Sequence, residues 1–452
     1  EISKKKIKSI GKTYYIETYG CQMNLADSEL VASTLQNIGY CSTTNIDLAD
    51  AIFINTCSIR EHAEEKIYSQ LGRYDLIKKR KPGTIIGVLG CMAQSLKHDL
   101  LENKPYVDII IGPDSYRNLP KIMSRSFSSS NIVDTKLSRF EVYDDLFPKR
   151  KNGVNAWVSI MRGCDKFCTF CIVPFTRGRE RSRSLNGIIS EIEQAVLDGF
   201  LEITLLGQNV NSYNYKGIYF HTLLDEISKI RGLKRIRYTS PHPKDMNDDV
   251  IDVMAKRDNI CNSIHLPLQA GSDRILKRMN RTYNKNEFIS LAEKIRQKIP
   301  NVGISTDIIV GFPGESSLEF QETLEVMEKI KFDSAFNFMY SSRRGTKASE
   351  YNDQIKENEK KERLRQVINL QKQHTLDRNI NLIGTVQEVL VEKESKMSSL
   401  DYAGRTDSNK WVIFKKDKYQ IGDLVDVQIY EAVGVTLKGK VIINSKNHDE
   451  IN

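Results

Sequence analysis

Short apolar runs alternate with amphipathic segments over the first part of the chain. The runs at 12–20, 49–56 and 83–90 contain β-branched or aromatic residues and are bounded by turn residues, which is typical of strands. The segment 24–39 carries apolar residues at helical spacing and ends in glycine. Because strands that alternate with helices form a mostly parallel sheet, residues 10–125 are predicted to be an open parallel α/β domain.

A strand–helix unit then recurs six times. Its strands are predicted at 155–161, 202–207, 235–240, 263–268, 302–311 and 332–340. Helical segments such as 185–199 and 286–299 separate them. Six successive units predict a curved parallel sheet, either an open partial barrel or a full barrel that lacks two units. A charged helix follows at 358–384, so this second domain is predicted to span 152–380 together with its trailing helix.

Two other segments have different patterns. Residues 126–151 are polar, rich in serine and without periodicity, which predicts a linker between domains. Residues 381–445 alternate short β runs with turns, which predicts a small all-β barrel. Barrels of this kind often bind RNA, and the exposed candidates for such a contact are Arg405, Trp411, Lys415 and Lys416.

Composition and charge narrow the class of protein. Of the 452 residues 40% are apolar and 28% are charged, as in ordinary globular proteins, and no apolar run approaches the ~20 residues that span a bilayer. The first 17 residues are basic without an apolar core, so no signal peptide is expected and a cytoplasmic location is predicted. No long exposed apolar seam is apparent, which favours a monomer.

The positive charge is unevenly distributed. Residues 149–190 contain nine Lys or Arg against two acids, and residues 343–380 contain ten against six. These segments could meet a polyanion, or they could be solvated faces, which is what most charge runs are. Charge alone leaves both interpretations open.

Three of the eight cysteines occupy equivalent places in the first domain. Cys21, Cys57 and Cys91 each directly follow a predicted strand. The loops after parallel strands lie at one edge of a sheet, so these thiols are predicted to converge on a shared metal site. The alternative is three small buried side chains, because free cysteine is often buried.

Three further cysteines follow the first strand of the second domain. Cys164, Cys168 and Cys171 are spaced C-x-x-x-C-x-x-C. Three thiolates on one loop can hold three irons of a cubane cluster and leave the fourth iron open for a reactant, whereas an electron-transfer cluster normally has four thiolates. A zinc site that includes a histidine is the alternative, although His221 and His242 lie in later units.

This motif resembles the radical S-adenosylmethionine signature. With Cys21, Cys57, Cys91 and the C-terminal barrel, the whole chain resembles the methylthiotransferase family, which has an N-terminal three-cysteine domain, a central partial barrel and a C-terminal TRAM domain. The resemblance implies two 4Fe–4S clusters, one on each thiol set. It implies that the second cluster binds and cleaves S-adenosylmethionine to give a radical, and that the first carries the sulfur that is methylated and donated.

The resemblance also implies contacts to S-adenosylmethionine. By position in the strand-end loops, these are Gly207, Gln208, Asn209, Gln269 and Gly311, and Ser272 is expected to face the same space. The other interpretation of each is an ordinary turn after a strand, where Gly, Asn and Pro are common. His242 is given no catalytic role, and Cys41 and Cys261 are expected to be inert.

The flanking residues bear on the substrate. The segments around Cys21 and Cys57 and the stretch 173–184 resemble the MiaB-type branch, which adds a methylthio group to C2 of N6-isopentenyladenosine beside the anticodon. A base in that position has to be turned out of the stack to react. Gln22 and Asn24 are candidate base contacts. The candidates for phosphate contacts are Arg177, Arg179, Arg181 and Arg183.

Other functions stay open from the sequence. Members of the family also modify N6-threonylcarbamoyladenosine in tRNA or an aspartate of a ribosomal protein. A non-catalytic iron–sulfur RNA-binding or sulfur-carrier protein would keep the cysteines but would not need the cofactor-binding strand ends, which argues against it. Reductive cofactor cleavage requires an electron donor, which the sequence does not identify.

Overall fold

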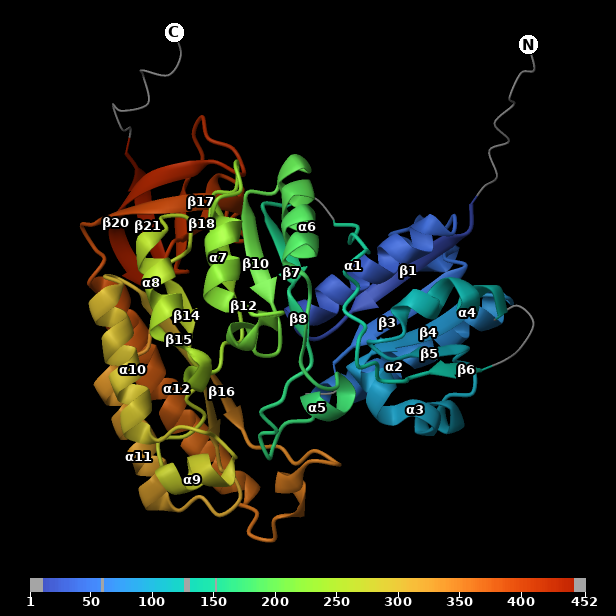
Figure 1. Cartoon of the computed structure of the whole chain (residues 1–452), viewed down its shortest axis with the longest axis horizontal. Coiled ribbons are helices and arrows are strands. Elements are labelled where there is room, and N and C mark those ends of the chain that lie inside the picture. Colours follow the sequence, from blue (N-terminus) through green and yellow to red (C-terminus); the bar gives the residue numbers. More distant parts are fainter. Residues whose placement is uncertain (1–10, 58–60, 126–130, 151–152, 443–452) are drawn as a thin grey trace.

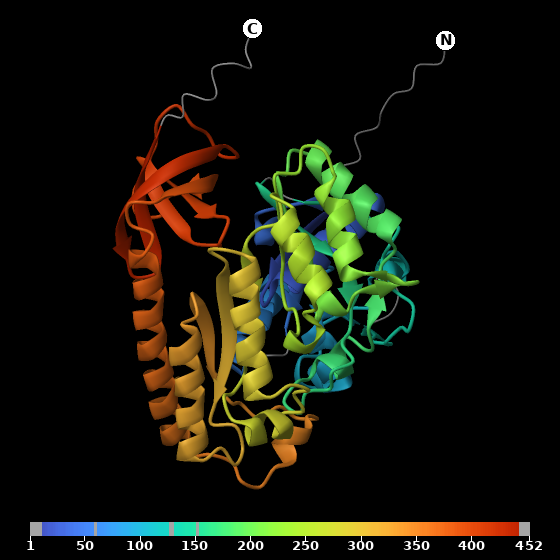
Figure 2. The same cartoon turned by 60° about the vertical axis from the view of Figure 1, so that its left-hand side comes forward.

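The computed structural model describes residues 11–57, 61–125, 131–150 and 153–442. An α/β domain, a barrel of strands and helices, and a small β-barrel follow one another along the chain (Figure 1). One long helix, α12 (Glu357–Ile380), runs along the outside of the central barrel up to the small β-barrel (Figure 2).

The N-terminal domain is an all-parallel sheet with the strand order β2-β1-β3-β4-β5-β6. Its strands are β1 (Thr13–Thr18), β2 (Cys41–Ser42), β3 (Ala51–Thr56), β4 (Ile85–Gly90), β5 (Ile109–Ile111) and β6 (Ile132–Asp134). Its helices are α1 (Gln22–Asn37), η1 (Ile46–Leu48), α2 (Glu61–Arg80), α3 (Cys91–Asn103), η2 (Tyr116–Asn118) and α4 (Leu119–Arg125). The predicted parallel α/β architecture is confirmed.

Both faces of this sheet are buried. Along β3, Phe53 joins one apolar cluster with Leu35 of α1, whereas Ile52 and Ile54 join another with Tyr74 of α2. Successive side chains of a strand point to opposite faces, so a strand of continuous apolar residues serves both clusters. A ligand can therefore meet side chains of this sheet at the ends of its strands.

The segment that we predict as a linker contributes to the N-terminal domain. β6 pairs with β5, and the Tyr143 ring packs against Tyr116 with its hydroxyl donating to the Pro113 carbonyl. The described part of this segment, 131–150, therefore completes the sheet before the chain leaves it. The local sequence does not predict this strand, because it is three residues long and flanked by polar residues.

The central domain is a partial barrel of six parallel strands in two halves. The strands are β7 (Asn155–Ser159), β10 (Glu202–Leu206), β13 (Arg235–Tyr238), β14 (Ser263–His265), β15 (Gly303–Val310) and β16 (Ser334–Met339). They are ordered β13-β10-β7 and β14-β15-β16, and a parallel bridge between Ile236 and Ile260 connects the halves. The predicted partial barrel is confirmed, and one continuous apolar cluster packs beneath its helices.

The helices and short strands of this domain fill the connections. The helices are α5 (Val173–Thr176), α6 (Leu185–Leu197), η3 (Val210–Ser212), α7 (Phe220–Ser228), η4 (Pro243–Asp245), α8 (Asp248–Lys256), α9 (Asp273–Arg278), α10 (Lys285–Lys298), α11 (Ser317–Ile330), η5 (Lys347–Glu350) and α12. The short strands are β8 (Met161–Arg162), β9 (Arg181–Ser182), β11 (Asn214–Tyr215) and β12 (Ile218–Tyr219).

The C-terminal domain is a closed five-stranded barrel, as predicted. Its strands are β17 (Val386–Glu394), β18 (Asp401–Thr406), β19 (Trp411–Lys415), β20 (Leu424–Val433) and β21 (Thr436–Val441), in the order β17-β18-β19-β21-β20. A small core that includes Val412, Phe414 and Leu437 fills it.

The small barrel closes one end of the central barrel. The Asp407 carboxylate accepts from the Asn262 backbone N–H at 3.0 Å, and Arg237 donates to the Thr406 carbonyl at 2.8 Å. Glu202, fully buried on β10, accepts from both Arg237 and Arg405 at 2.9 and 2.8 Å. These contacts lie at the N-terminal ends of the strands, so the C-terminal ends remain for chemistry.

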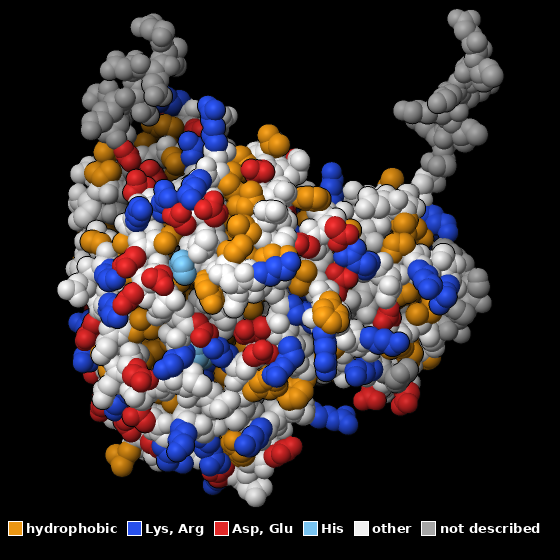
Figure 3. Space-filling view, viewed as in Figure 1, with side chains coloured by type: hydrophobic (Ala, Val, Ile, Leu, Met, Phe, Trp, Pro, Cys, Tyr) orange, Lys and Arg blue, Asp and Glu red, His pale blue; other side chains and the backbone are white. Residues whose placement is uncertain are grey.

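The surface carries both signs of charge. Lys and Arg are interspersed with Asp and Glu over the face shown in Figure 3 rather than gathered in one patch. Among the described residues, no helix has the length and apolar character needed to cross a membrane.

Candidate active site

The first three thiols meet at one edge of the N-terminal sheet. Cys21 precedes α1, Cys57 follows β3 and Cys91 begins α3 directly after β4, and these strands are neighbours. The side chain of Cys57 interacts with those of both Cys21 and Cys91. Residues 36 and 34 positions apart along the chain are thus brought into contact by the parallel topology.

Two glycines permit this approach. Gly20 and Gly90 have φ of 120° and 87°, in the left-handed region that favours glycine. A Cβ atom at Gly20 would lie 2.8 Å from Cβ of Cys57, and one at Gly90 would lie 2.3 Å from Oδ1 of Asn55. A side chain at either position would therefore push the thiol loops apart.

Two of these thiols have lowered pKa values. Interaction with the Cys57 side chain lowers the pKa of Cys21 to about 6 and that of Cys91 to about 7, and the nearby Arg177 guanidinium acts in the same direction. The same two contacts raise the pKa of Cys57. Thiolates are the form that binds metal, so Cys21 and Cys91 are the two thiols of this set that ionise most readily for ligation.

A buried amide network holds the loop of Cys21. The Sγ atom of Cys21 lies 3.3 Å from Oδ1 of Asn24, whose Nδ2 donates to Asn55 at 3.0 Å. Asn55 in turn donates to the Asn24 carbonyl and to Ser28, both at 2.9 Å. Asn24 is fully buried, so the predicted contact between Asn24 and a substrate base is wrong; Gln22 is exposed beside it.

The second set of thiols lies on a loop closed by a short hairpin. β8 pairs with β9 through Met161–Ser182 and Arg162–Arg181, which holds both ends of the loop at 163–180. Gly163, with φ of 79°, begins the loop, and a Cβ atom there would lie 2.0 Å from the Arg179 carbonyl oxygen. The sequence C-x-x-x-C-x-x-C therefore winds back on itself at the C-terminal end of β7.

Burial and one arginine set the electrostatics of this loop. Burial raises the pKa of Cys164 to about 11 and that of Cys171 to about 12. The remaining thiol, Cys168, receives a hydrogen bond from Arg281 Nη1 at 3.3 Å. Arg281 also donates to the Pro267 carbonyl at 3.3 Å, which ties the cysteine loop to the connection after β14. Nothing in the local sequence pattern pointed to Arg281.

The two domains meet through a buried ionic group. Asp27 of α1, fully buried, accepts from Arg162 at 2.6 Å and from Arg177 at 2.9 Å. The Nε of Arg177 lies 3.2 Å from Sγ of Cys91, while its Nη1 is buried without a hydrogen-bond partner among the described residues. Arg177 follows α5 of the second cysteine loop, so its side chain links the first thiol set to the loop that carries the second.

This arrangement corrects the predicted phosphate contacts. Arg177, Arg181 and Arg183 are only 3%, 8% and 4% exposed. Arg181 pairs with Asp114 at 2.9 Å, and Arg183 pairs with Glu191. Buried, paired guanidinium groups cannot bind a phosphate backbone, so those three assignments are wrong. Arg179 alone of the four is open to solvent, with its side chain 65% exposed.

The strand-end residues predicted to bind S-adenosylmethionine surround the second loop. Gln208 Oε1 accepts from the Gly163 backbone N–H at 2.6 Å, and Asn209 donates to Asp245 at 2.7 Å. Gly207 packs on Met161, where a Cβ atom would lie 2.6 Å from Cγ. Their role toward the cofactor stays a prediction.

The later strand ends are similarly constrained. Gln269 has φ of 71°, and its buried Oε1 has no hydrogen-bond partner among the described residues. Gly311 has φ of 68° and lies against Lys360, and its N–H donates to Glu315 at 2.7 Å. Ser272 donates to Glu319 at 3.2 Å rather than pointing to an open space. Of these groups, the buried and unsatisfied Oε1 of Gln269 is the one that can accept a hydrogen bond from a ligand.

The donor sets fit iron–sulfur clusters. Each set offers three thiols at a strand end, with an arginine donating to one sulfur: Arg177 to Cys91 and Arg281 to Cys168. Hydrogen bonds to cluster sulfurs are a general means of tuning such sites. Within the described part of the chain, no three His, Cys, Asp or Glu residues are grouped so as to hold one metal ion. That finding concerns a single ion; the ligands of a four-iron cluster lie further apart.

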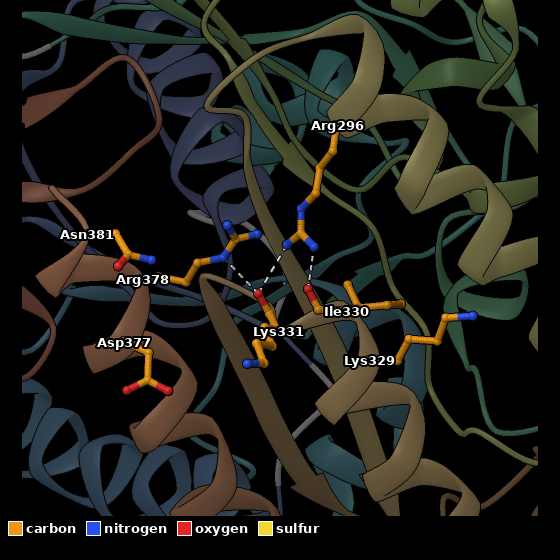
Figure 4. Close-up of a pocket in the computed structure, with 7 residues that line it drawn as sticks. All are labelled: Arg296, Lys329, Ile330, Lys331, Asp377, Arg378 and Asn381. Carbon is orange, nitrogen blue, oxygen red and sulfur yellow. Dashed lines mark hydrogen bonds between the residues drawn. The ribbon is translucent and has the colours of Figure 1, made fainter.

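A cavity elsewhere has a structural explanation. It measures 220 Å³ and lies where α10, α11 and α12 end (Figure 4). Arg296 and Arg378 each donate to the Lys331 carbonyl at 3.1 Å, and Arg296 also donates to the Ile330 carbonyl. The guanidinium groups thus satisfy the carbonyls that end α11, and burial with a neighbouring arginine lowers the pKa of Arg296 to about 10.

Three family models match the chain in order. Residues 13–112 match the uncharacterized protein family UPF0004, residues 158–327 match the radical SAM superfamily, and residues 381–442 match the TRAM domain. Each match lies on one of the three domains of the structure.

Solved structures share the fold at low identity. The radical S-adenosylmethionine methyltransferase TsrM from Kitasatospora setae, solved with cobalamin and a [4Fe–4S] cluster, aligns with a TM-score of 0.57 at 10% identity, covering 75% of this chain and 77% of that one. The cobalamin-dependent radical enzyme OxsB aligns with a TM-score of 0.53 at 13% identity, covering 78% and 56%.

Curated relatives match over nearly the whole length. Among them are proteins named tRNA-2-methylthio-N(6)-dimethylallyladenosine synthase. That of Christiangramia forsetii is 45% identical over 96% of this chain and 95% of its own length. Those of Parabacteroides distasonis and Carboxydothermus hydrogenoformans are each 46% identical, over 97% and 95% of this chain and 97% and 99% of their own. The chain therefore belongs to the radical S-adenosylmethionine family of tRNA-2-methylthio-N(6)-dimethylallyladenosine synthases.

Proposed function

We propose that this protein is a tRNA methylthiotransferase that adds a methylthio group to C2 of N6-dimethylallyladenosine, also called N6-isopentenyladenosine, next to the anticodon. The observation that carries the proposal is the pairing of two three-thiol sets across one domain interface, linked by Arg177, in a member of this family. One set alone would serve cofactor cleavage. Two adjoining sets suit a reaction that also delivers sulfur.

We assign one 4Fe–4S cluster to each set. The first is held by Cys21, Cys57 and Cys91, and the second by Cys164, Cys168 and Cys171. Three thiolates leave one iron without a protein ligand in each cluster. When bound, the first cluster would supply the sulfur for transfer, and the second would supply the electron that cleaves S-adenosylmethionine.

The chain's own groups position these reactants. Arg281 and Arg177 each donate a hydrogen bond to one thiol sulfur, of Cys168 and Cys91 respectively, and so help to fix its position. For S-adenosylmethionine, the unsatisfied Oε1 of Gln269 and the loop of Gly207, Gln208 and Asn209 lie at strand ends on the same side of the barrel as the second set. At Gly311 no side chain fits, because a Cβ atom there would lie 2.4 Å from Cγ of Lys360.

The tRNA meets the protein outside this buried centre. Exposed Gln22 beside Cys21 is the candidate for a base contact, and exposed Arg179 is the candidate for a phosphate contact. On the small barrel, the ammonium of Lys393 lies 4.1 Å from the Trp411 ring, a surface suited to RNA. We propose a cytoplasmic monomer that receives electrons from a separate donor protein.

Mass spectrometry of nucleosides from digested tRNA tests the function. Cells that lack the gene should accumulate N6-dimethylallyladenosine and lose its 2-methylthio derivative. The wild-type gene should restore the product, whereas a gene encoding Cys168→Ala should not. An unchanged profile of that nucleoside in the deletion strain would refute the assignment and redirect the search to threonylcarbamoyladenosine or a ribosomal protein.

A further inference from the structure

One face of the second half-barrel exposes aromatic side chains. Phe336 and Phe338 on β16 are 59% and 38% exposed, although strand phenylalanines normally pack against something. On the opposite face of the same sheet, Ile304, Ile308 and Val310 of β15 are buried. The exposure is therefore specific to the inward face and is not a property of a loose sheet.

The strand register shows which residues share the exposed face. Asp307 is paired with Phe336 and Ile309 with Phe338, and paired residues of adjacent strands point to the same side. His265 of β14 completes the group, with its ring centroid 5.8 Å from that of Phe336. The face thus combines the apolar Phe336, Phe338 and Ile309 with the polar His265 and Asp307.

The polar half is hydrogen-bonded and fixed. His265 Nε2 lies 3.3 Å from the Asp307 carboxylate, and its Nδ1 lies 3.0 Å from the Ser305 hydroxyl. These contacts set the orientation of the imidazole beside the phenyl ring. A ligand here would meet hydrogen-bonding groups on one side and two phenyl rings on the other.

One end of this face is closed, and the other end lies toward the second thiol set. At the N-terminal ends of the strands the small barrel blocks it: Asp407 binds the Asn262 backbone N–H, and a Cβ atom at Gly303 would lie 2.5 Å from the Ser408 carbonyl oxygen. At the other end, β14 continues to Pro267, whose carbonyl accepts from Arg281, and Arg281 also donates to Cys168. A ligand at the C-terminal end of this face would therefore lie beside the second thiol set.

We propose that Phe336 and Phe338 bind the five-carbon dimethylallyl group of the substrate adenosine and make the enzyme selective for it. The proposal rests on the proposed function. Binding of a branched, uncharged hydrocarbon to two exposed phenyl rings is favourable, because it removes the apolar surface of both partners from water. A threonylcarbamoyl group carries a carboxylate instead. That carboxylate would be repelled by the like charge of Asp307 and would lose its hydration against the phenyl rings, so its binding is disfavoured.

The test compares two forms of one tRNA. Reconstituted holoenzyme is assayed anaerobically with tRNA that carries either N6-dimethylallyladenosine or unmodified adenosine at the target position, and kcat/KM is measured for each. Phe336→Ala and Phe338→Ala, singly and together, should reduce the preference for the dimethylallyl form at least tenfold, in line with the worth of apolar contacts in a specificity site. The dissociation constants of the two tRNAs should converge as well.

Two further variants make the result interpretable. Phe140→Ala removes an equally large ring that is 87% exposed elsewhere, and it should keep the wild-type preference. Phe336→Leu keeps an apolar side chain and should retain most of the preference. A double alanine variant with wild-type preference would overturn the proposal, and so would a leucine variant as impaired as the alanine one. Failure of the proposed function is a separate result: the wild-type enzyme would then form no methylthio product on the dimethylallyl tRNA.

Discussion

Replacement of Asp27 is expected to have the largest effect on the free energy of unfolding. Its fully buried carboxylate accepts from Arg162 and Arg177, which are themselves only 3% exposed and belong to the other domain. Asp27→Asn keeps the shape of the side chain but removes its negative charge. Two guanidinium groups would then be buried with an uncompensated charge at the domain interface.

The expected magnitude follows from that burial. Removing one partner of a buried ion pair typically costs about 3–5 kcal/mol, because the other charge stays desolvated. An exposed pair is worth about 0–1 kcal/mol. Asp47→Asn provides the matched control, since Asp47 and its partner Arg80 have side chains 58% and 70% exposed.

Urea unfolding of the anaerobic holoprotein, followed by circular dichroism, measures both variants against the wild type. Asp27→Asn should lower the free energy of unfolding by about 3–5 kcal/mol and Asp47→Asn by less than about 1 kcal/mol. The iron content of the first thiol set should also fall in Asp27→Asn, because Arg177 loses the group that holds it beside Cys91. If the two variants unfold within about 1 kcal/mol of each other, the ionic group does not join the domains as argued.

Three other outcomes are expected. Cys168→Ala should abolish formation of 5′-deoxyadenosine, whereas Cys57→Ala should spare reductive cofactor cleavage and stop methylthio transfer; product from the Cys57 variant would remove the first set from sulfur delivery. Arg179→Ala should weaken tRNA binding and lower the slope of log affinity against log salt by about one, and an unchanged slope would place the phosphate contacts elsewhere. Glu319 accepts two hydrogen bonds from Arg274, which lower its pKa from 4.5 to about 2. The contribution of this ion pair to stability is thus complete above pH 4.5 and is lost as the pH falls toward 2. The destabilisation by Glu319→Gln should therefore be larger at pH 7 than at pH 3. An equal effect at both pH values would contradict the pairing.

Local pattern was sufficient for the architecture of the chain. The predicted helices at 185–199, 286–299 and 358–384 correspond to α6, α10 and α12 within a few residues. Each is recognisable because apolar residues at helical spacing, capping residues and glycine are properties of the chain itself. β6 was missed because a three-residue strand contains too little of any pattern and depends on its pairing with β5.

The placement of Cys21, Cys57 and Cys91 at one sheet edge also followed from the sequence. Each ends a strand, and parallel strands end at the same edge, so topology carries the argument without tertiary detail. The sequence could not indicate that Cys57 interacts with both of its neighbours or that Arg177 reaches Cys91. Those contacts depend on how the second domain docks on the first.

The arginines show where sequence reasoning stops. The stretch at 177–183 looks the same whether its charges face solvent or pair with buried acids, because the partners lie far away in the chain: Asp27 is 150 residues from Arg177, and Asp114 is 67 from Arg181. Likewise, the alternation along β16 predicts a strand but not which face is left uncovered. The sequence by itself determined most of the longer elements, the parallel α/β class and the position of the cysteines after strands, since these depend on local periodicity and spacing. Burial, charge pairing and the open aromatic face were decided by the tertiary structure, since each depends on which distant surface packs against the residue.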